Sequence, residues 1–231
     1  MEITPIKKYF AECICTFLLV FCGTGAIIIN QISGGVITHV GVAATFGLIV
    51  MALIDTLGDV SGAHFNPAVS VAFWLAKRFP AQEVLLYIGS QVIGGILAST
   101  LLWVIFPEHL TLGATIPKQG EMQSFVLEIL LMFFLMFVIL NVSSGSKEKG
   151  LTAAITIGAV VGLEAMFAGP LSGASMNPAR SLAPALISGN FASLWIYLTA
   201  PFIGAGAAIL GCRGVREKEC CSSGMCASNR N

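Results

Sequence analysis

Two stretches of the sequence carry the same three residues, Asn66-Pro67-Ala68 and Asn177-Pro178-Ala179. Asn is a favoured helix N-cap, because its side-chain oxygen can accept a backbone N–H of the first turn. Pro suits the first helical position, where its missing N–H costs nothing. Each Asn therefore keeps its side-chain NH₂ free to donate a hydrogen bond beyond the end of the helix. The pattern predicts two helix starts that each present a donor to whatever lies in front of them.

Arg180 follows the second of these motifs directly. It falls in the first turn of the predicted helix, where a cation opposes the helix dipole. Its neighbours are apolar, and a charge at membrane depth is costly. A cation that opposes two energetic preferences indicates a functional role. The alternative is an arginine whose side chain reaches the membrane surface.

The elements that must position these residues are membrane helices. The chain has 231 residues, 56% hydrophobic and only 10% charged, with a mean hydropathy of +0.87. A helix needs roughly 20 apolar residues to cross a bilayer, and six stretches are long enough: 9–30, 38–57, 84–106, 123–141, 151–169 and 193–212. Two more apolar pieces, 67–76 and 178–188, are too short and begin at the Asn-Pro pairs. We expect an all-α membrane protein with six transmembrane helices and two re-entrant half-helices.

The two halves of the chain repeat each other. The segment 61–68 matches 172–179 at an offset of 111, and Glu12 matches Glu128 at an offset of 116. Each half has three spans, so the second half must enter the bilayer from the opposite side. Inverted repeats with interrupted helices point to a site near the midplane, where the interruptions meet. We expect one channel domain over 1–212, built from an inverted three-helix repeat with halves of about 1–115 and 116–212.

The loops in front of the short helices, 58–65 and 170–176, should lie at membrane depth. Non-helical backbone is tolerated there only where it is buried in protein or lines a wet cavity. In a pore, backbone carbonyls of these loops would face the solute, and the candidates are Gly62, Ala63, His64, Gly173 and Ser175. Two converging helix N-termini repel cations and protons. Water that accepts from both Asn residues cannot also accept in a proton wire. The pattern favours passage of neutral molecules.

Basic residues set the expected orientation. With the N-terminus inside, ten of the twelve Lys and Arg lie on the cytoplasmic side: Lys7, Lys8, Lys77, Arg78, Lys147, Lys149, Arg213, Arg216, Lys218 and Arg230. By the positive-inside rule, both termini are expected in the cytoplasm, and the cell membrane is the expected location. The formal net charge is zero and there is no basic run, which gives no support for nucleic-acid binding.

The segment 213–231 is expected to be a cytoplasmic, disordered tail with three cysteines, Cys220, Cys221 and Cys226. Because that side of the membrane is reducing, we expect no disulfide framework. The three thiols could bind a soft ion or trivalent arsenic. Lipidation, or no role at all, is the alternative, and no other metal site or cofactor is expected.

The segments SGAHFNPAVS at 61–70 and SGASMNPARS at 172–181 resemble the aquaporin (major intrinsic protein) family, and the resemblance covers about 8–212. Within that family, 167–186 is most similar to the nodulin-26-like intrinsic proteins and their bacterial relatives. The resemblance implies the aquaporin fold and a homotetramer with one pore per subunit.

The resemblance also implies a constriction of four residues, which are Phe46, Ala165, Ala174 and Arg180. Water-selective members typically have His where this chain has Ala165, so the constriction should be wider here. Ser181 replaces the Asp of glycerol facilitators, whereas Tyr197-Leu198 favours the solute-conducting branch. We therefore expect passage of water and small uncharged solutes, namely glycerol, urea or undissociated metalloid acids such as arsenous, boric or silicic acid.

Three acidic residues of the spans and the three histidines have expected roles of their own. Glu12 and Glu128 match positions where the family uses a carboxylate to accept hydrogen bonds from the re-entrant loops; pairing with another polar group is the alternative. Glu164 could contact another subunit, fill a polar pocket or line the lumen. His64 could act as a pH gate, although packing is the simpler expectation. His39 and His109 are expected in outer loops without a task.

Two other classes of function compete with a channel. Ion-coupled secondary transporters also use inverted repeats and broken helices, and this chain has carboxylates within its spans, among them Glu12, Glu128 and Glu164. A non-conducting membrane protein would leave Arg180 without a reason. An enzyme is not expected, because the spans contain no nucleophile elbow, phosphate loop or metal-binding spacing.

Overall fold

The computed structural model describes residues 4–143, 151–216 and 221. Those residues form eight α-helices and no strand. Six helices are long and apolar enough to cross a membrane: α1 (Pro5–Ile32), α2 (Thr38–Ser61), α4 (Ala81–Ile105), α5 (Glu121–Val142), α6 (Leu151–Ser172) and α8 (Leu194–Val215). The other two are short, α3 (Pro67–Leu75) and α7 (Pro178–Ser188). The predicted all-α architecture of six spans and two half-helices is confirmed.

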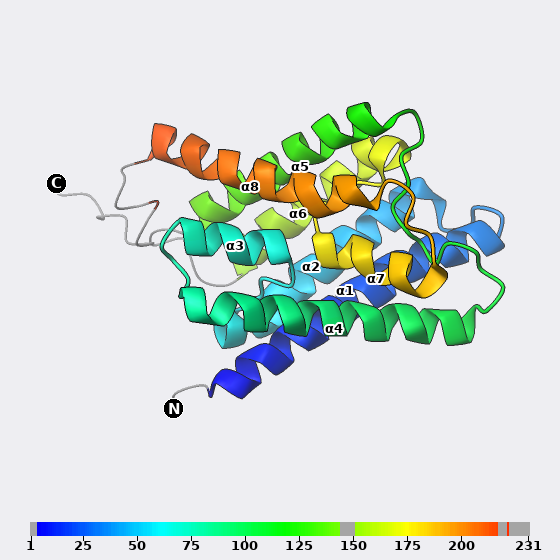
Figure 1. Ribbon diagram of the computed structural model, residues 1–231, viewed down its shortest axis with the longest axis horizontal. Helices are drawn as coiled ribbons and strands as arrows, with labels where there is room; N and C mark the ends of the chain where they lie inside the picture. The colour runs from blue at the N-terminus through cyan, green and yellow to red at the C-terminus, as the bar shows by residue number, and fades with distance from the viewer. Residues whose placement is uncertain (1–3, 144–150, 217–220, 222–231) are drawn as a thin grey trace.

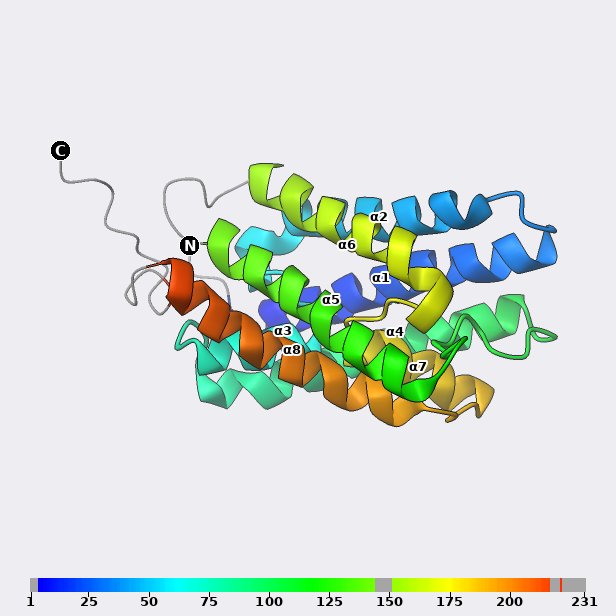
Figure 2. The same cartoon turned by 90° about the horizontal axis from the view of Figure 1, so that it is seen from above.

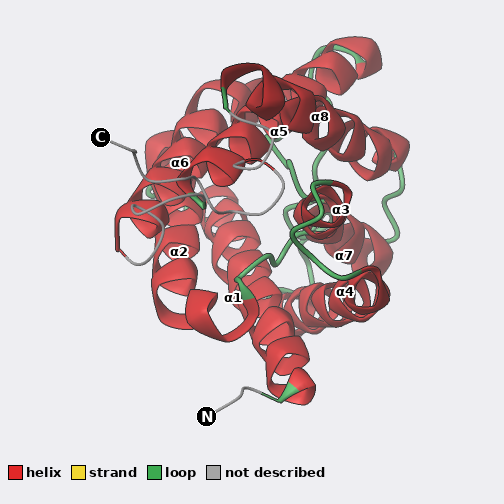
Figure 3. Cartoon of the chain, turned by 90° about the vertical axis from the view of Figure 1, so that its left-hand side faces the viewer, coloured by secondary structure: helices red, strands yellow, loops and turns green. Residues whose placement is uncertain are grey.

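Both half-helices lie inside the bundle of long helices. In Figure 1, α3 and α7 follow one another between α8 and α4, and both of them contact these two long helices. Figure 2 shows the long helices running in roughly the same direction, inclined to one another. Figure 3 looks along them and shows the loops that lead into α3 and α7 in the interior of the bundle. The half-helices are therefore held from several sides.

The two re-entrant loops follow the same backbone path. Gly62 and Gly173 begin them with φ of 85° and 89°, and Ala63 and Ala174 follow with φ of 45° and 42°. The residues directly before the two Asn-Pro pairs also have positive φ, 31° and 54°. Left-handed backbone is uncommon and strained for residues other than Gly. Its recurrence at matching positions shows that the duplication extends to local backbone geometry.

Glycine allows a close approach of α2 and α6, one helix from each half. A Cβ on Gly47 would lie 2.7 Å from the carbonyl oxygen of Gly158 and 3.0 Å from Cα of Gly162. Small residues let membrane helices approach closely and gain van der Waals contact. The contact fixes the spacing of the two helices that carry Phe46 and Ala165.

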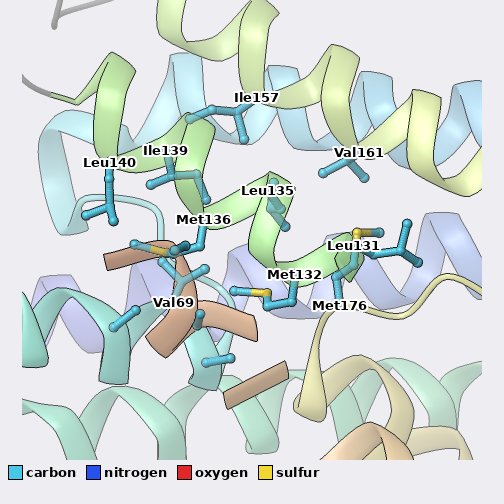
Figure 4. Close-up of a cluster of buried hydrophobic side chains, with 14 of the residues drawn as sticks. Val69, Leu131, Met132, Leu135, Met136, Ile139, Leu140, Ile157, Val161 and Met176 are labelled. Atoms are coloured by element: carbon cyan, nitrogen blue, oxygen red, sulfur yellow. The ribbon is translucent and has the colours of Figure 1, made fainter. Parts of the chain in front are cut away.

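The largest cluster of buried apolar side chains surrounds α5. Its side chains in Figure 4, among them Leu131 and Met136, face Val69 of α3 on one side and Val161 of α6 on the other. Met176, from the second re-entrant loop, belongs to the same cluster. One helix thus packs against both the first half-helix and the second loop. Close packing of this kind resists displacement of either one.

The C-terminal end of the described chain differs from expectation. α8 continues to Val215, beyond the boundary predicted at 212, and Cys212 forms a disulfide with Cys221. The prediction of no disulfide is wrong at this pair, because α8 places Cys212 where a cysteine nine residues later can reach it. Cys221 is therefore not a free thiol that could bind metal. Cys220 and Cys226 lie outside the described residues.

Candidate solute pore

The Asn residues of the two motifs bind each other's loops. The side chain of Asn66 donates to the carbonyl of Met176 at 2.8 Å, and that of Asn177 donates to the carbonyl of Phe65 at 2.8 Å. Their side-chain oxygens cap the half-helices, and Asn66 accepts from Ala68 N at 2.9 Å. The caps are as the sequence predicts. The amide, however, is not wholly free: one of its two N–H groups joins the half-helices, and one remains for a solute.

Two carboxylates hold the loops from behind. Glu12 accepts from the backbone N–H groups of His64 and Phe65 at 2.9 and 2.7 Å. Glu128 accepts from the N–H groups of Ser175 and Met176, both at 2.9 Å. Each carboxylate also accepts from the Ser hydroxyl at the start of its loop. These bonds satisfy backbone donors that would otherwise be left unpaired at membrane depth, which is expensive.

The same bonds determine where the loop carbonyls point. In a trans peptide, the N–H of one residue and the C=O of the residue before it point in opposite directions. Because the N–H groups of residues 64, 65, 175 and 176 face the carboxylates, the carbonyls of Ala63, His64, Ala174 and Ser175 point away from them. Ala63 and His64 line one cavity, and Ala174 lines another. The loops thus offer acceptors on the side away from the carboxylates.

Two cavities enter the bundle from opposite ends of the long helices. The Arg180 cavity, of about 870 Å³, is lined by all four predicted constriction residues, Phe46, Ala165, Ala174 and Arg180, and by Gly173. The His64 cavity, of about 610 Å³, is lined by Gly62, Ala63, His64 and Asn66 of the predicted pore residues. They have no lining residue in common. The hydrogen bonds by which Asn66 and Asn177 join the two loops lie between the two cavities. We call this pair of bonds the joint.

Arg180 is held by the protein although it faces a cavity. Its side chain is 2% exposed, and Nη1 donates to the carbonyl of Gly113 at 3.2 Å. The guanidinium carbon lies 5.2 Å from the ring centroid of Phe46, within reach of a cation–π interaction. Its Nε has no hydrogen-bond partner in the described part of the chain. The charge is therefore fixed in place and keeps at least one donor uncommitted.

The remaining constriction positions contribute only methyl groups. Ala165 and Ala174 are 8% and 7% exposed and line the Arg180 cavity. On α1, a Cβ at Gly23 would overlap the ring of Phe46, so this glycine makes room for the one bulky member of the set. Gly23 was not identified from the sequence, because no motif marks it. One aromatic ring, two methyls and one cation therefore face the same cavity, in a partly apolar wall.

Comparison with known proteins agrees with this geometry. Residues 1–211 match the family model described as major intrinsic protein. The chain belongs to this family, the family of the aquaporin channels. It is 45% identical to aquaporin NIP1-1 of Oryza sativa subsp. japonica over 203 residues, which cover 87% of this chain and 72% of that protein. It is 42% identical to nodulin-26 of Glycine max over 201 residues, with 87% and 74% covered.

A solved structure is also similar. The X-ray structure of the aquaglyceroporin from Plasmodium falciparum superimposes with a TM-score of 0.81 and covers 89% of this chain and 94% of that one, at 21% sequence identity. At that identity the likeness supports the aquaporin fold alone. Together with the nodulin-26-like relatives, it agrees with the predicted family, and the protein is a multi-pass membrane channel rather than an enzyme.

His64 is packed among other side chains in the wall of the cavity that is named after it. Its Nδ1 is 3.1 Å from the hydroxyl of Ser70, and its ring stacks on Phe73 with centroids 4.8 Å apart. The rings of Phe79 and Tyr87 lie within 4.8 and 5.2 Å of it. Three aromatic neighbours and 7% exposure favour the packing role over a gate.

Glu164 is buried within the single chain, at 2% exposure, so the subunit-contact alternative has no support. Neither of its oxygens has a hydrogen-bond partner among the described residues. It lies between Val161, which lines the His64 cavity, and Ala165, which lines the Arg180 cavity. Neither cavity is lined by Glu164 itself, so lining of the lumen has no support either, and burial in a polar pocket is the alternative that remains.

Two histidines assigned no task by the sequence make specific bonds beside the Arg180 cavity. His39 Nε2 lies 2.6 Å from the carbonyl of Met166. His109 Nε2 lies 2.7 Å from Oε1 of Gln31, and its Nδ1 accepts from the backbone N–H of Leu112 at 3.0 Å. The contacts of His39 with Met166 and of His109 with Gln31 join segments far apart in sequence, so no local pattern could have revealed them.

Proposed function

We propose that this aquaporin is a passive channel for water and small uncharged solutes, and that it excludes protons and ions. The observation that carries the proposal is the joint in which Asn66 and Asn177 each cap one half-helix and bind the opposite loop. The joint brings two helix N-termini to one point between two cavities. A neutral molecule can accept a hydrogen bond there, whereas a cation meets two positive dipole ends and Arg180.

The loop carbonyls supply the other half of the hydrogen bonding. A solute that leaves water must exchange its hydration for protein partners. Arg180 and the two Asn side chains donate, and the carbonyls of Gly62, Ala63, His64, Gly173 and Ser175 accept. Glu12 and Glu128 brace these loops without lining the pore, because their oxygens are occupied by the loop N–H and hydroxyl groups.

The proposed solutes follow from the small side chains of the constriction. With methyl groups at Ala165 and Ala174, molecules larger than water have room beside Phe46 and Arg180. We propose glycerol, urea and undissociated metalloid acids such as arsenous or boric acid as solutes.

The assembly and orientation are part of the same proposal. We propose a homotetramer in the cell membrane with both termini in the cytoplasm, as the family resemblance and the distribution of basic residues indicate. Arg78 lines the His64 cavity, and Lys118 lines the Arg180 cavity. On this orientation, the His64 cavity opens to the cytoplasm and the Arg180 cavity to the outside.

Comparative swelling of liposomes with water, glycerol, urea and arsenite tests the solute range. Wild-type protein should pass water and at least glycerol. Ala165→His should reduce glycerol flux relative to water by at least about tenfold, the range in which one steric change discriminates between solutes. Passage of water alone by the wild type, or unchanged selectivity in Ala165→His, would show that the constriction is not wide for the reason given.

A further inference from the structure

The loop between α4 and α5 lines the Arg180 cavity and forms hydrogen bonds with two consecutive residues of α7, Arg180 and Ser181. The carbonyl of Gly113 accepts from Nη1 of Arg180 at 3.2 Å, and Thr115 Oγ1 donates to Oγ of Ser181 at 2.8 Å. Gly113 and Thr115 are both buried. The position of the filter arginine therefore depends on how this loop is held.

The turn at residues 112 and 113 is tightly constrained. Leu112 and Gly113 both have positive φ, 48° and 72°. Leu112 is fully buried and packs with Ile28 and Leu102. A Cβ on Gly113 would lie 2.8 Å from Cβ of Thr24, so the backbone approaches α1 as closely as it can. A strained turn of this kind persists only when its surroundings fix it.

His109 supplies one of those fixing contacts. Its Nδ1 accepts from the backbone N–H of Leu112 at 3.0 Å, and its Nε2 lies 2.7 Å from Oε1 of Gln31 at the end of α1. A ring nitrogen that accepts carries no proton, and a nitrogen facing an amide oxygen must donate. Only the neutral ring with its proton on Nε2 satisfies both contacts. The ring thus ties the turn to α1.

We propose that His109 is a positioning residue for the filter: its neutral ring holds the turn at Leu112, so that the Gly113 carbonyl can hold Arg180. Protonation of Nδ1 of His109 removes the acceptor of the Leu112 N–H, and it places the new ring N–H against that backbone N–H. Arg180 then loses its fixed acceptor and its guanidinium turns towards the lumen, where it obstructs solutes larger than water. The solute readout rests on the proposed channel function, but the state of the loop does not.

Burial lowers the pKa of His109 below its ordinary value, which is about 6.5. The ring of His109 is therefore neutral near neutral pH, and it becomes protonated only in acid. The other titratable or charged groups around the same cavity are Glu108, His39 at the start of α2, Lys118 and Arg180. From α1, the neighbours Asn30 and Gln31 are uncharged. Single substitutions can show which of these groups causes an acid response.

The test is glycerol flux relative to water flux in proteoliposomes with equal pH on both sides, taken from about pH 7.5 to about pH 4.5 across the histidine range. Wild type should lose about three- to tenfold of its relative glycerol flux in acid, the factor that one net hydrogen bond carries. His109→Gln can still donate and accept but does not titrate, so its flux should be independent of pH. His109→Ala should show the reduced flux at every pH.

Matched controls are His39→Gln and Glu108→Gln, which should keep the acid response of the wild type. Hydrogen exchange of the 106–120 peptide in the purified protein gives a readout that needs no solute. The wild-type rate divided by that of His109→Gln should be near one at neutral pH and rise in acid. An acid response that persists in His109→Gln, or its absence in wild type by both readouts, would overturn the proposal. Absence of glycerol flux at all pH values would instead contradict the channel function, and the exchange ratio would still decide the role of His109.

Discussion

Replacing Glu128 with Gln tests how the second re-entrant loop is held. The carboxylate accepts three hydrogen bonds: Oε1 from Ser172 Oγ at 2.7 Å and from Ser175 N at 2.9 Å, and Oε2 from Met176 N at 2.9 Å. An amide of the same shape keeps one acceptor oxygen, while its NH₂ must face a donor. In the better orientation, the bonds on Oε1 survive and the Met176 N–H is left buried without a partner.

The cost follows from these contacts. Bonds to a charged group contribute about 1.5–3 kcal/mol each, and neutral ones about 0.5–1.5 kcal/mol, whereas an orphaned buried donor costs about 1–3 kcal/mol. Two weakened bonds and one orphan together lower the free energy of unfolding by about 3–6 kcal/mol. Glu12→Gln is the matched variant in the first half. There, Oε2 also accepts from Nε2 of Gln91 at 2.7 Å. Gln91 could accept from the new NH₂ only by reversing its amide, and its own NH₂ would then take the place of Oε1, which has no hydrogen-bond partner among the described residues.

We therefore expect Glu12→Gln to cost about 1–3 kcal/mol more than Glu128→Gln, because one more buried donor is left without a partner. Unfolding midpoints measured in the same detergent at one heating rate give the order of the variants. In a Gln91→Leu background, the extra cost of Glu12→Gln should disappear. Equal costs in the wild-type background, or a smaller cost for Glu12→Gln, would refute the account of how the carboxylates hold the loops.

Three further predictions concern the filter loop and the Asn joint. Gly113→Ala should cost about 1–3 kcal/mol more than Gly189→Ala in unfolding, because both glycines have a positive φ but only Gly113 lacks space for a Cβ; equal costs would contradict the close approach. Asn177→Asp keeps the cap but loses the donor to the Phe65 carbonyl, so a pH gradient across liposomes should decay faster than with wild type; an unchanged decay rate would mean that the joint does not block protons. Because the pKa of His109 is lowered in the folded protein, the free energy of unfolding should fall as pH drops below about 6.5. In His109→Gln this part of the acid dependence should be missing, as denaturant titrations at several pH values would show.

Much of the architecture is encoded locally, which is why the sequence alone predicts it. The starts of α3 and α7 agree with the Asn-Pro pairs to the residue, since capping and a fixed proline φ act within one turn. The repeat also identified Glu12 and Glu128 as matching acidic residues, and the resemblance to the aquaporin family supplied their role in holding the loops. These inferences need no knowledge of distant contacts.

The remaining features depend on contacts between distant segments. The Asn66 amide bonds a carbonyl 110 residues away, and the filter arginine bonds Gly113, 67 residues before it. The sequence identifies the donors but not the acceptors, because loop backbone carries no signal of which carbonyl will be nearby. The disulfide of Cys212 was missed for a different reason. The expectation of a reducing compartment applies to cysteines in general, whereas one particular pair can bond only where the fold brings its two sulfurs together.

Glycerol flux into proteoliposomes, measured against concentration with and without a proton gradient, tests the central claim of a passive channel most directly. The account predicts flux that rises in proportion to glycerol concentration and is indifferent to the gradient. Flux that saturates and follows the proton gradient would contradict it and would identify a secondary transporter built on the same inverted repeat.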